Sequence, residues 1–322
     1  MKLQASLRSL YEDQLPLAEK MRSEVDRTLR AAKNERWHYE SRVKRLESFC
    51  SKIETGRVEN PRALDDFLAC TLVVPNALAI PLAVSVVEEQ FEIVNRKPES
   101  SSETLKPADT FRFDDLRMYC RRYNDGSRPS DILDDFVFEV QIKTFLQHAW
   151  AIATHDLSYK ASEVRWGRDR IVAHLKAAIE HAEVSILEAD VLSQSNILQL
   201  SHPRTENVIG MLEILKEHWQ EDERPYNLRG LAETLADLIH YAGLEPADIG
   251  RVLAEEREAH DGTLPANLSP YGVIIRLLIL KHPGNVKTAL RRKKIKILLT
   301  PELEIPPGFP PDNLASQVIR VP

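Results

Sequence analysis

The sequence contains no apolar run of about 18 residues, which is the length that a membrane-spanning helix requires. Its opening segment carries charges throughout and lacks the apolar centre of a secretory signal peptide. Cysteine is scarce: the 3 cysteines lie far apart and in no metal-ligand spacing, so we expect buried free thiols in a reducing compartment. These absences predict a cytoplasmic protein with no membrane partner.

An excess of positive charge is also absent, since 43 Lys and Arg face 49 Asp and Glu, for a formal net charge of −6. This balance argues against general coating of nucleic acid, although it permits a local basic cleft. The apolar content of 43% and charged content of 29% are those of a soluble globular protein. A chain of 322 residues can form one large domain or two ordinary ones, and it leaves open whether the protein forms a homo-oligomer.

The hydrophobic pattern divides the chain near residue 200, where a polar segment with Pro203 interrupts it. We predict an N-terminal helix over 1–35, an α/β region over 36–200 and an all-α domain over 201–322. Short apolar runs and alternation predict the strands, at 39–44, 65–74, 91–96, 113–123 and 136–143. Helical spacing predicts one helix that begins at about residue 47. It also predicts helices over 77–90, 144–161, 162–198, 205–222, 227–242, 246–258 and 269–281. The segments 97–109 and beyond 300 are expected to be irregular.

Two polar residues, Glu139 and Gln141, interrupt the apolar strand at 136–143. These two residues share one parity and therefore one face of the strand. The apolar residues Phe136, Phe138, Val140 and Ile142 share the other parity and point to the opposite face. A carboxylate on an open sheet face can bind Mg²⁺ or accept a proton from an attacking hydroxyl. The alternative is an ordinary solvated strand face.

A basic segment lies earlier in the chain. Arg42 and Lys44 share a parity on an extended stretch, while Ser48 and Lys52 share one face of the helix that follows. Ser48 lies in the first turn of this helix, where free N–H groups and the helix dipole favour anions. Three cations and a hydroxyl would suit a triphosphate; the alternative is a solvated basic helix face.

Asp66 begins the next apolar strand. An acid in this place is commonly a turn former or a cap. It could instead supply a second oxygen ligand for a metal shared with Glu139, and two acids facing a phosphate clamp are suited to phosphoryl or nucleotidyl transfer.

The basic segment, Asp66 and the stretch 138–160 together resemble the synthetase domain of the RelA/SpoT family, the (p)ppGpp synthetases that include the small alarmone synthetases. The resemblance covers about residues 35–165. It implies an α+β fold with a nucleotidyltransferase-like mixed β-sheet flanked by helices. It also implies Mg²⁺-dependent transfer of the β,γ-pyrophosphate of ATP to the 3′-hydroxyl of GDP or GTP.

The resemblance further implies a role for each matching residue. Arg42 would stack on adenine, and the ATP phosphates would be held by Lys44, Ser48 and Lys52. Asp66 and Glu139 would bind Mg²⁺, with Glu139 also the general base. The acceptor side of the cleft would be lined by Phe113, Arg117, Gln141, His155 and Lys160.

The sequence departs from the family pattern in two places. Where the family has Gly and Arg after the aspartate, this chain has Ala69 and Thr71, so one ATP contact is missing or comes from elsewhere. The family's acceptor motif is replaced by the sequence from Phe113 to Arg117, which keeps only an aromatic platform. The acceptor could therefore be the 3′ CCA end of tRNA, as in toxin members of the family. A third alternative is a catalytically weakened protein that only binds nucleotide.

Other signals are weak. His148 and His155 lie seven residues apart without a third ligand spacing, so we do not predict zinc. No second His/Asp cluster suggests a hydrolase site. The basic run at 287–296 is either a solvated helix end or an RNA-phosphate patch.

Overall fold

The computed structural model describes residues 3–56, 58, 60–100, 116–124, 126, 129–154, 165–292 and 295–321. Contacts divide the chain into two compact units, Met1–Ser195 and Asn196–Pro322. The division lies within a few residues of the polar segment that the sequence suggests as a boundary. Each unit is described by itself below.

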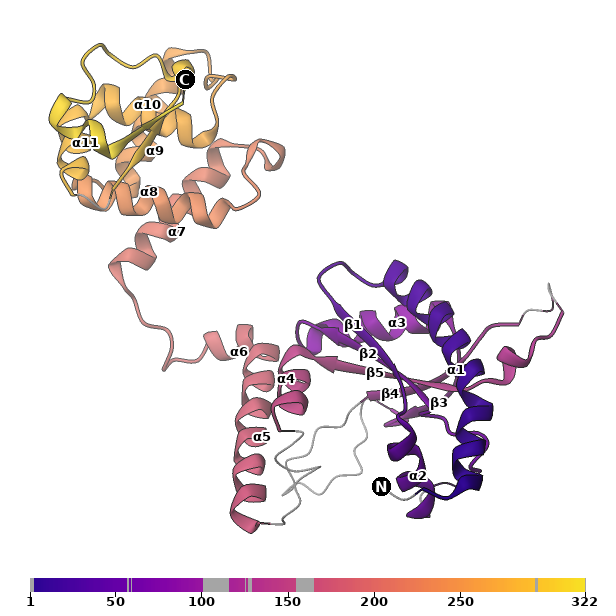
Figure 1. Cartoon of the computed structure of the whole chain (residues 1–322). Coiled ribbons are helices and arrows are strands. Elements are labelled where there is room, and N and C mark those ends of the chain that lie inside the picture. Colours follow the sequence, from indigo (N-terminus) through magenta and orange to yellow (C-terminus); the bar gives the residue numbers. More distant parts are fainter. Residues whose placement is uncertain are drawn as a thin grey trace. The chain divides into compact units, whose positions relative to one another are not determined.

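The first unit is built on a five-stranded mixed sheet with the strand order β1-β2-β5-β4-β3 (Figure 1). The strands are β1 His38–Val43, β2 Leu68–Val74, β3 Glu92–Lys97, β4 Leu116–Arg121 and β5 Phe138–Thr144. The central pair β2 and β5 is parallel, and the other three pairs are antiparallel. The predicted hairpin between the fourth and fifth strands is confirmed, because β4 and β5 pair in antiparallel register.

Helices flank this sheet, as predicted. They are α1 Ala5–Ala32, α2 Leu46–Glu54, α3 Ile80–Gln90, α4 Phe145–Thr154, α5 Trp166–Leu187 and α6 Ala189–Ser193. Short 3₁₀ turns precede α3, at Ala77–Ala79, and β5, at Ile132–Asp135. The predicted N-terminal helix is part of this unit, since its buried side chains join the core of the sheet.

The core lies on the face of the sheet that α1 and α3 cover. Met21 and Val25 of α1 and Val87 of α3 pack with alternate residues of the strands, among them Val140 and Met118. Because side chains of a strand alternate between faces, the residues between these core positions point to the opposite face. This alternation places Glu139 and Gln141 away from the main core.

The second unit is mainly helical. Its helices are α7 Pro203–His218, α8 Leu228–Ala242, α9 Pro246–Ala259, α10 Pro270–Lys281 and α11 Pro283–Leu290. Proline begins α7, α9, α10 and α11, where the missing N–H costs no helical hydrogen bond. Gly243, with a φ of 68°, ends α8 in the left-handed conformation that glycine adopts without strain.

Helix α11 and two short strands of the second unit were not predicted. Short strands β6 Ile297–Leu299 and β7 Val318–Arg320 form a parallel pair in the segment expected to be irregular. Turns of 3₁₀ helix occur at Glu221–Glu223, Pro301–Leu303 and Asp312–Gln317. Leu299 and Leu303 are buried in the helical core, so this segment closes the unit.

The three cysteines are buried free thiols, as predicted. Cys50, Cys70 and Cys120 are buried and form no disulfide. Within the described part of the chain, no helix has both the length and the apolar character needed to cross a membrane.

Candidate active site

The polar face of the sheet is organised around Glu139. In the strand register Glu139 lies between Ala69 of β2 and Tyr119 of β4, and Gln141 lies beside Arg117 of β4. These five side chains therefore project from neighbouring positions on one face. The structure thus brings together Glu139, Gln141 and Arg117, which the sequence analysis assigned to one cleft.

Glu139 is a buried carboxylate, only 2% exposed. The side-chain amide of Gln141 donates a hydrogen bond to its Oε1. An Arg117 guanidinium nitrogen lies 3.9 Å from its Oε2. A buried charge is costly unless it is paired and hydrogen-bonded, and these two neighbours supply that compensation. Glu139 is consequently held in a fixed position as an acceptor.

Tyr119 belongs to the same cluster, although it was not among the predicted site residues. Burial raises the pKa of the Tyr119 hydroxyl, and the nearby charge of Glu139 raises it further. The Lys97 ammonium of β3 lies 5.5 Å from the centre of the Tyr119 ring, within cation–π range. Lys97 is the last residue of β3, whereas the sequence pattern predicts the start of a polar loop there, and this concealed its place in the site.

Asp66 forms a second polar cluster with two predicted phosphate ligands. Its Oδ2 accepts contacts from Lys44 Nζ at 2.9 Å and from Lys52 Nζ at 2.8 Å. Burial alone would raise the pKa of the Asp66 carboxyl, but the hydrogen bonds and charges of Lys52 and Lys44 outweigh it. The pKa is therefore below its ordinary value. This geometry gathers two ammonium groups at one point beside β2.

The other oxygen of Asp66, Oδ1, is buried and has no hydrogen-bond partner among the described residues. A buried carboxylate oxygen without a partner is unusual in a folded protein. Mg²⁺ prefers carboxylate oxygen ligands, so an orphan oxygen of this kind fits the predicted metal. Asp66 lies three residues before Ala69, and Ala69 pairs in register with Glu139. Because β2 and β5 are parallel, both acids lie near the amino ends of these two neighbouring strands.

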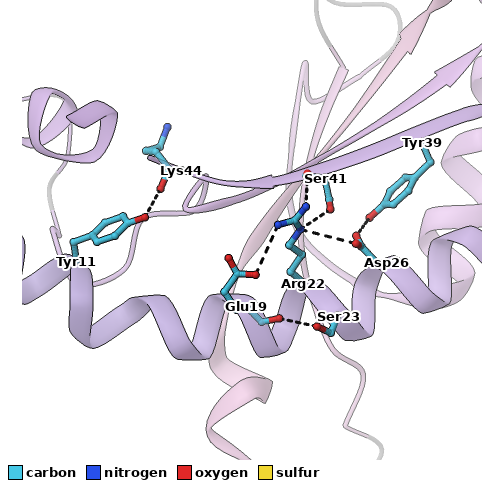
Figure 2. Close-up of polar contacts among 8 residues, drawn as sticks. All are labelled: Tyr11, Glu19, Arg22, Ser23, Asp26, Tyr39, Ser41 and Lys44. Carbon is cyan, nitrogen blue, oxygen red and sulfur yellow. Dashed lines mark hydrogen bonds and ion pairs between the residues drawn. The ribbon is translucent and has the colours of Figure 1, made fainter. Parts of the chain in front are cut away.

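Helix α1 fixes the strand that leads to Lys44. Arg22 donates hydrogen bonds to both the hydroxyl and the carbonyl of Ser41, at 3.0 and 3.1 Å (Figure 2). The Tyr11 hydroxyl donates to the carbonyl of Lys44 at 3.0 Å, while the Lys44 ammonium points away from Tyr11 (Figure 2). The backbone of Lys44 is thereby anchored, and its charged end remains directed to Asp66.

Arg42 and Ser48, the remaining predicted ATP ligands, are exposed. Arg42 pairs in register with Ala69, so it projects from the same sheet face as Glu139. Ser48 lies in the first turn of α2, which also contains the acid Glu47. Both positions are open to solvent, and their predicted roles in ATP binding stay predictions.

The two departures from the family pattern lie next to the central cluster. Ala69 is the register partner of Glu139, and Thr71 is the partner of Gln141. Arg117 occupies the other side of Gln141. A guanidinium is therefore available on this face, from β4, although the position of Thr71 on β2 provides none.

Three predicted acceptor residues, Phe113, His155 and Lys160, lie outside the described residues. In the basic run at 287–296, Arg291 and Arg292 are exposed and belong to the second unit, while residues 293–294 also lie outside the described part.

Comparison with known families identifies one segment. Residues 41–164 match the family described as "Region found in RelA / SpoT proteins". This segment includes both polar clusters. It confirms the RelA/SpoT resemblance for this part of the chain, and no curated protein matches the sequence.

Solved structures of similar fold include small alarmone synthetase 1 from Bacillus subtilis, at 14% identity, covering 57% of this chain and 97% of that chain, with a TM-score of 0.46. A GTP pyrophosphokinase family protein from Streptococcus pneumoniae has 14% identity, covers 61% of this chain and 97% of its own, and gives a TM-score of 0.43. Small alarmone synthetase 2 from Bacillus subtilis has 19% identity, with the match covering 56% of this chain and 97% of that chain, and gives a TM-score of 0.42.

Proposed function

We propose that the RelA/SpoT region at residues 41–164 of this chain transfers the β,γ-pyrophosphate of ATP to the 3′-hydroxyl of GDP or GTP. In this reaction the 3′-oxygen attacks the β-phosphorus of ATP, the bond between that phosphorus and the α,β-bridging oxygen breaks, and AMP leaves. The hydroxyl proton must be accepted by a base. The observation that carries the proposal is a buried carboxylate, Glu139, fixed on the polar face of the sheet within this region.

Glu139 is suited to the role of general base. Its Oε1 is engaged by Gln141, and Arg117 stands 3.9 Å from Oε2, so the carboxylate keeps a fixed orientation while retaining acceptor capacity. A positioned base of this kind contributes about 10²–10⁴ to a rate. Arg117 and Lys97 add positive charge on the acceptor side, where the pyrophosphate product would accumulate negative charge.

Lys44 and Lys52 supply the phosphate clamp. Both ammonium groups reach a single oxygen of Asp66, which shows that they can converge on one anionic oxygen. Phosphate oxygens of ATP would take the place of that carboxylate oxygen as acceptors. Asp66 and Glu139 would hold Mg²⁺, which when bound neutralises phosphate charge and orients the triphosphate.

The proposal is tested by incubating the protein with ATP labelled at the γ-phosphate, together with GDP, GTP or bulk tRNA in separate reactions. Because the β,γ-pyrophosphate moves as a unit, the label follows it to the acceptor. We expect labelled GDP or GTP and unlabelled tRNA. Label in tRNA alone would replace the acceptor with an RNA end, and no transfer to any acceptor in the presence of Mg²⁺ would contradict the enzymatic proposal.

A further inference from the structure

A cluster of two histidines and one glutamate lies beside the residues described above, on the same face of the sheet, because Glu40 pairs in register with Thr71, the partner of Gln141. His38 and Glu40 belong to β1, and His148 belongs to α4. One ligand atom from each of the three side chains lies within 4.8 Å of the other two. Among the described residues, this is the one group of three or more His, Cys, Asp or Glu that has the spacing to hold a metal ion.

The fold explains why these residues meet. His38 and Glu40 are two apart on a strand, so they project from the same face. Helix α4 begins at Phe145, directly after β5, and it packs on β2 and β5. The rings of His38 and His148 lie with their centres 5.7 Å apart. Two residues from the edge strand β1 and one from α4, the helix that follows β5, are thus brought together from distant parts of the sequence.

Within the described part of the chain, the ligand atoms of the cluster make no hydrogen bonds to other residues. His38 Nε2 lies 4.0 Å from Glu40 Oε2, which is too far for a hydrogen bond. In the described part of the chain, no hydrogen bond to another residue engages the side chain of His38, Glu40 or His148. Two imidazoles and one carboxylate therefore face one another with no partner between them among the residues that the structure describes.

The donor set selects a class of metal. Imidazole nitrogen favours the later first-row divalent ions such as Zn²⁺, whereas Mg²⁺ prefers oxygen ligands alone. In a tetrahedral zinc site the ligand atoms lie roughly 3.3 Å apart, as follows from metal–ligand distances of about 2.0–2.1 Å. His38 and Glu40 have exposed side chains, 51% and 55%, that can rotate to close the difference. Their exposure leaves the fourth position open to water.

We propose that His38, Glu40 and His148 form a binding site for a late first-row divalent metal ion, with Zn²⁺ as the ion that reveals it. The bound ion would join β1 to α4. Two residues after Glu40, β1 carries Arg42, and the strand before α4 carries Glu139. The metal would therefore act as a structural link between the two segments that flank the polar face. This proposal does not depend on the proposed pyrophosphate transfer.

The test is a titration of the full chain, free of any affinity tag and of nucleotide, with ZnCl₂ in competition with a chromophoric chelator. Three variants are compared with the wild type: His38→Gln/His148→Gln, Glu40→Gln, and the control His174→Gln/His181→Gln. The control removes two exposed histidines of α5 from the same unit. Circular dichroism and the Tm without metal establish that each variant is folded, and the exposed Glu40 provides a substitution that does not disturb the core.

We expect the wild type and the control to bind one equivalent of Zn²⁺ and to gain Tm when it is added. The double histidine variant should bind it more than about tenfold more weakly, since loss of even an outer partner of a metal site costs about 10–100-fold in affinity. Glu40→Gln should also weaken binding. Failure of the wild type to bind, equal binding by the double histidine variant, or full displacement of Zn²⁺ by an equal concentration of Mg²⁺ would overturn the proposal.

Discussion

Lys52 provides a quantitative test of the phosphate clamp. In the free protein its ammonium lies 2.8 Å from Asp66 Oδ2, and the two side chains are 33% and 22% exposed. A phosphate oxygen that replaced the carboxylate at this partly buried point would receive a charge-assisted hydrogen bond. Such a bond contributes about 1.5–3 kcal/mol. Lys52→Ala should therefore weaken ATP binding by roughly 10- to 150-fold.

The same substitution should have little effect on folding. Lys44 remains 2.9 Å from Asp66 Oδ2 after Lys52 is truncated, so the carboxylate keeps a partner. Because Lys52 is partly exposed and Lys44 keeps the carboxylate paired, we expect a change in the free energy of unfolding of about 1 kcal/mol or less. A large loss of affinity with little loss of stability is the signature of a ligand contact.

Calorimetric titration with a non-hydrolysable ATP analogue measures the affinity, and urea denaturation measures the stability. Lys281→Ala is the matched control, because Lys281 is a partly exposed lysine paired with Glu255 at 3.5 Å in the second unit. It should bind the analogue like the wild type. If Lys52→Ala and Lys44→Ala both bind the analogue with wild-type affinity, the triphosphate lies elsewhere and the reasoning about Asp66 is wrong.

Three other predictions concern the acids and the basic run. Asp66→Asn should raise the Mg²⁺ concentration needed for half-maximal transfer by more than about tenfold, measured as the rate of product formation against Mg²⁺; an unchanged requirement would place the metal elsewhere. Because the folded state lowers the pKa of Asp66 below its ordinary 3.8, its contribution to stability is present above that pH and is lost as the pH falls through the folded pKa. Urea denaturation at pH 7 and at pH 3 should then show a smaller acid-induced loss in Asp66→Asn than in the wild type, and equal losses would contradict the assignment. Arg291→Glu/Arg292→Glu should leave transfer to GDP unchanged. A drop in GDP labelling would contradict this prediction and would mean that the second unit takes part in the reaction.

The face of each strand was predictable from the sequence because alternation is a local property. The apolar positions of the strand at Phe138–Thr144 pack with α1 and α3, and Glu139 and Gln141 project to the other side, as their parity predicts. Except for α11, the helices of both units were predictable for a similar reason, since their apolar residues recur at helical spacing. Local rules therefore gave the mixed α+β class and the helical second unit.

Features that depend on distant pairing were not predictable. His38 and Glu40 meet His148 only because β1 and α4 both lie beside the central strands, which no local pattern reveals. Strands β6 and β7 have three residues each, too few for an alternation to be recognised, and their pairing joins separate parts of the C-terminal segment. Lys97 was missed because the polar residues after it concealed the end of β3.

The different surroundings of the two carboxylate oxygens of Asp66 could not be predicted from the sequence either. The sequence placed it at the start of a buried strand, where an acid is commonly a cap or a turn former and a metal ligand was the alternative. The structure shows one oxygen shared by two lysines and the other buried without a partner among the described residues. That division between two oxygens is a property of side-chain geometry, which a sequence does not contain.

The central claim is that Glu139 is the base of a transferase site, and Glu139→Gln tests it most directly. The substitution keeps the size of the side chain and an acceptor oxygen for Gln141, while it removes the charge and the basicity. Glu256→Gln is the matched control, because Glu256 is a buried glutamate of the second unit, paired with Arg276 at 3.2 Å. In single-turnover transfer from γ-labelled ATP, we predict that Glu139→Gln is slower by about 10²–10⁴ while its affinity for ATP stays within a few-fold of wild type, and that the control is unaffected. Near-normal transfer by Glu139→Gln would contradict the account.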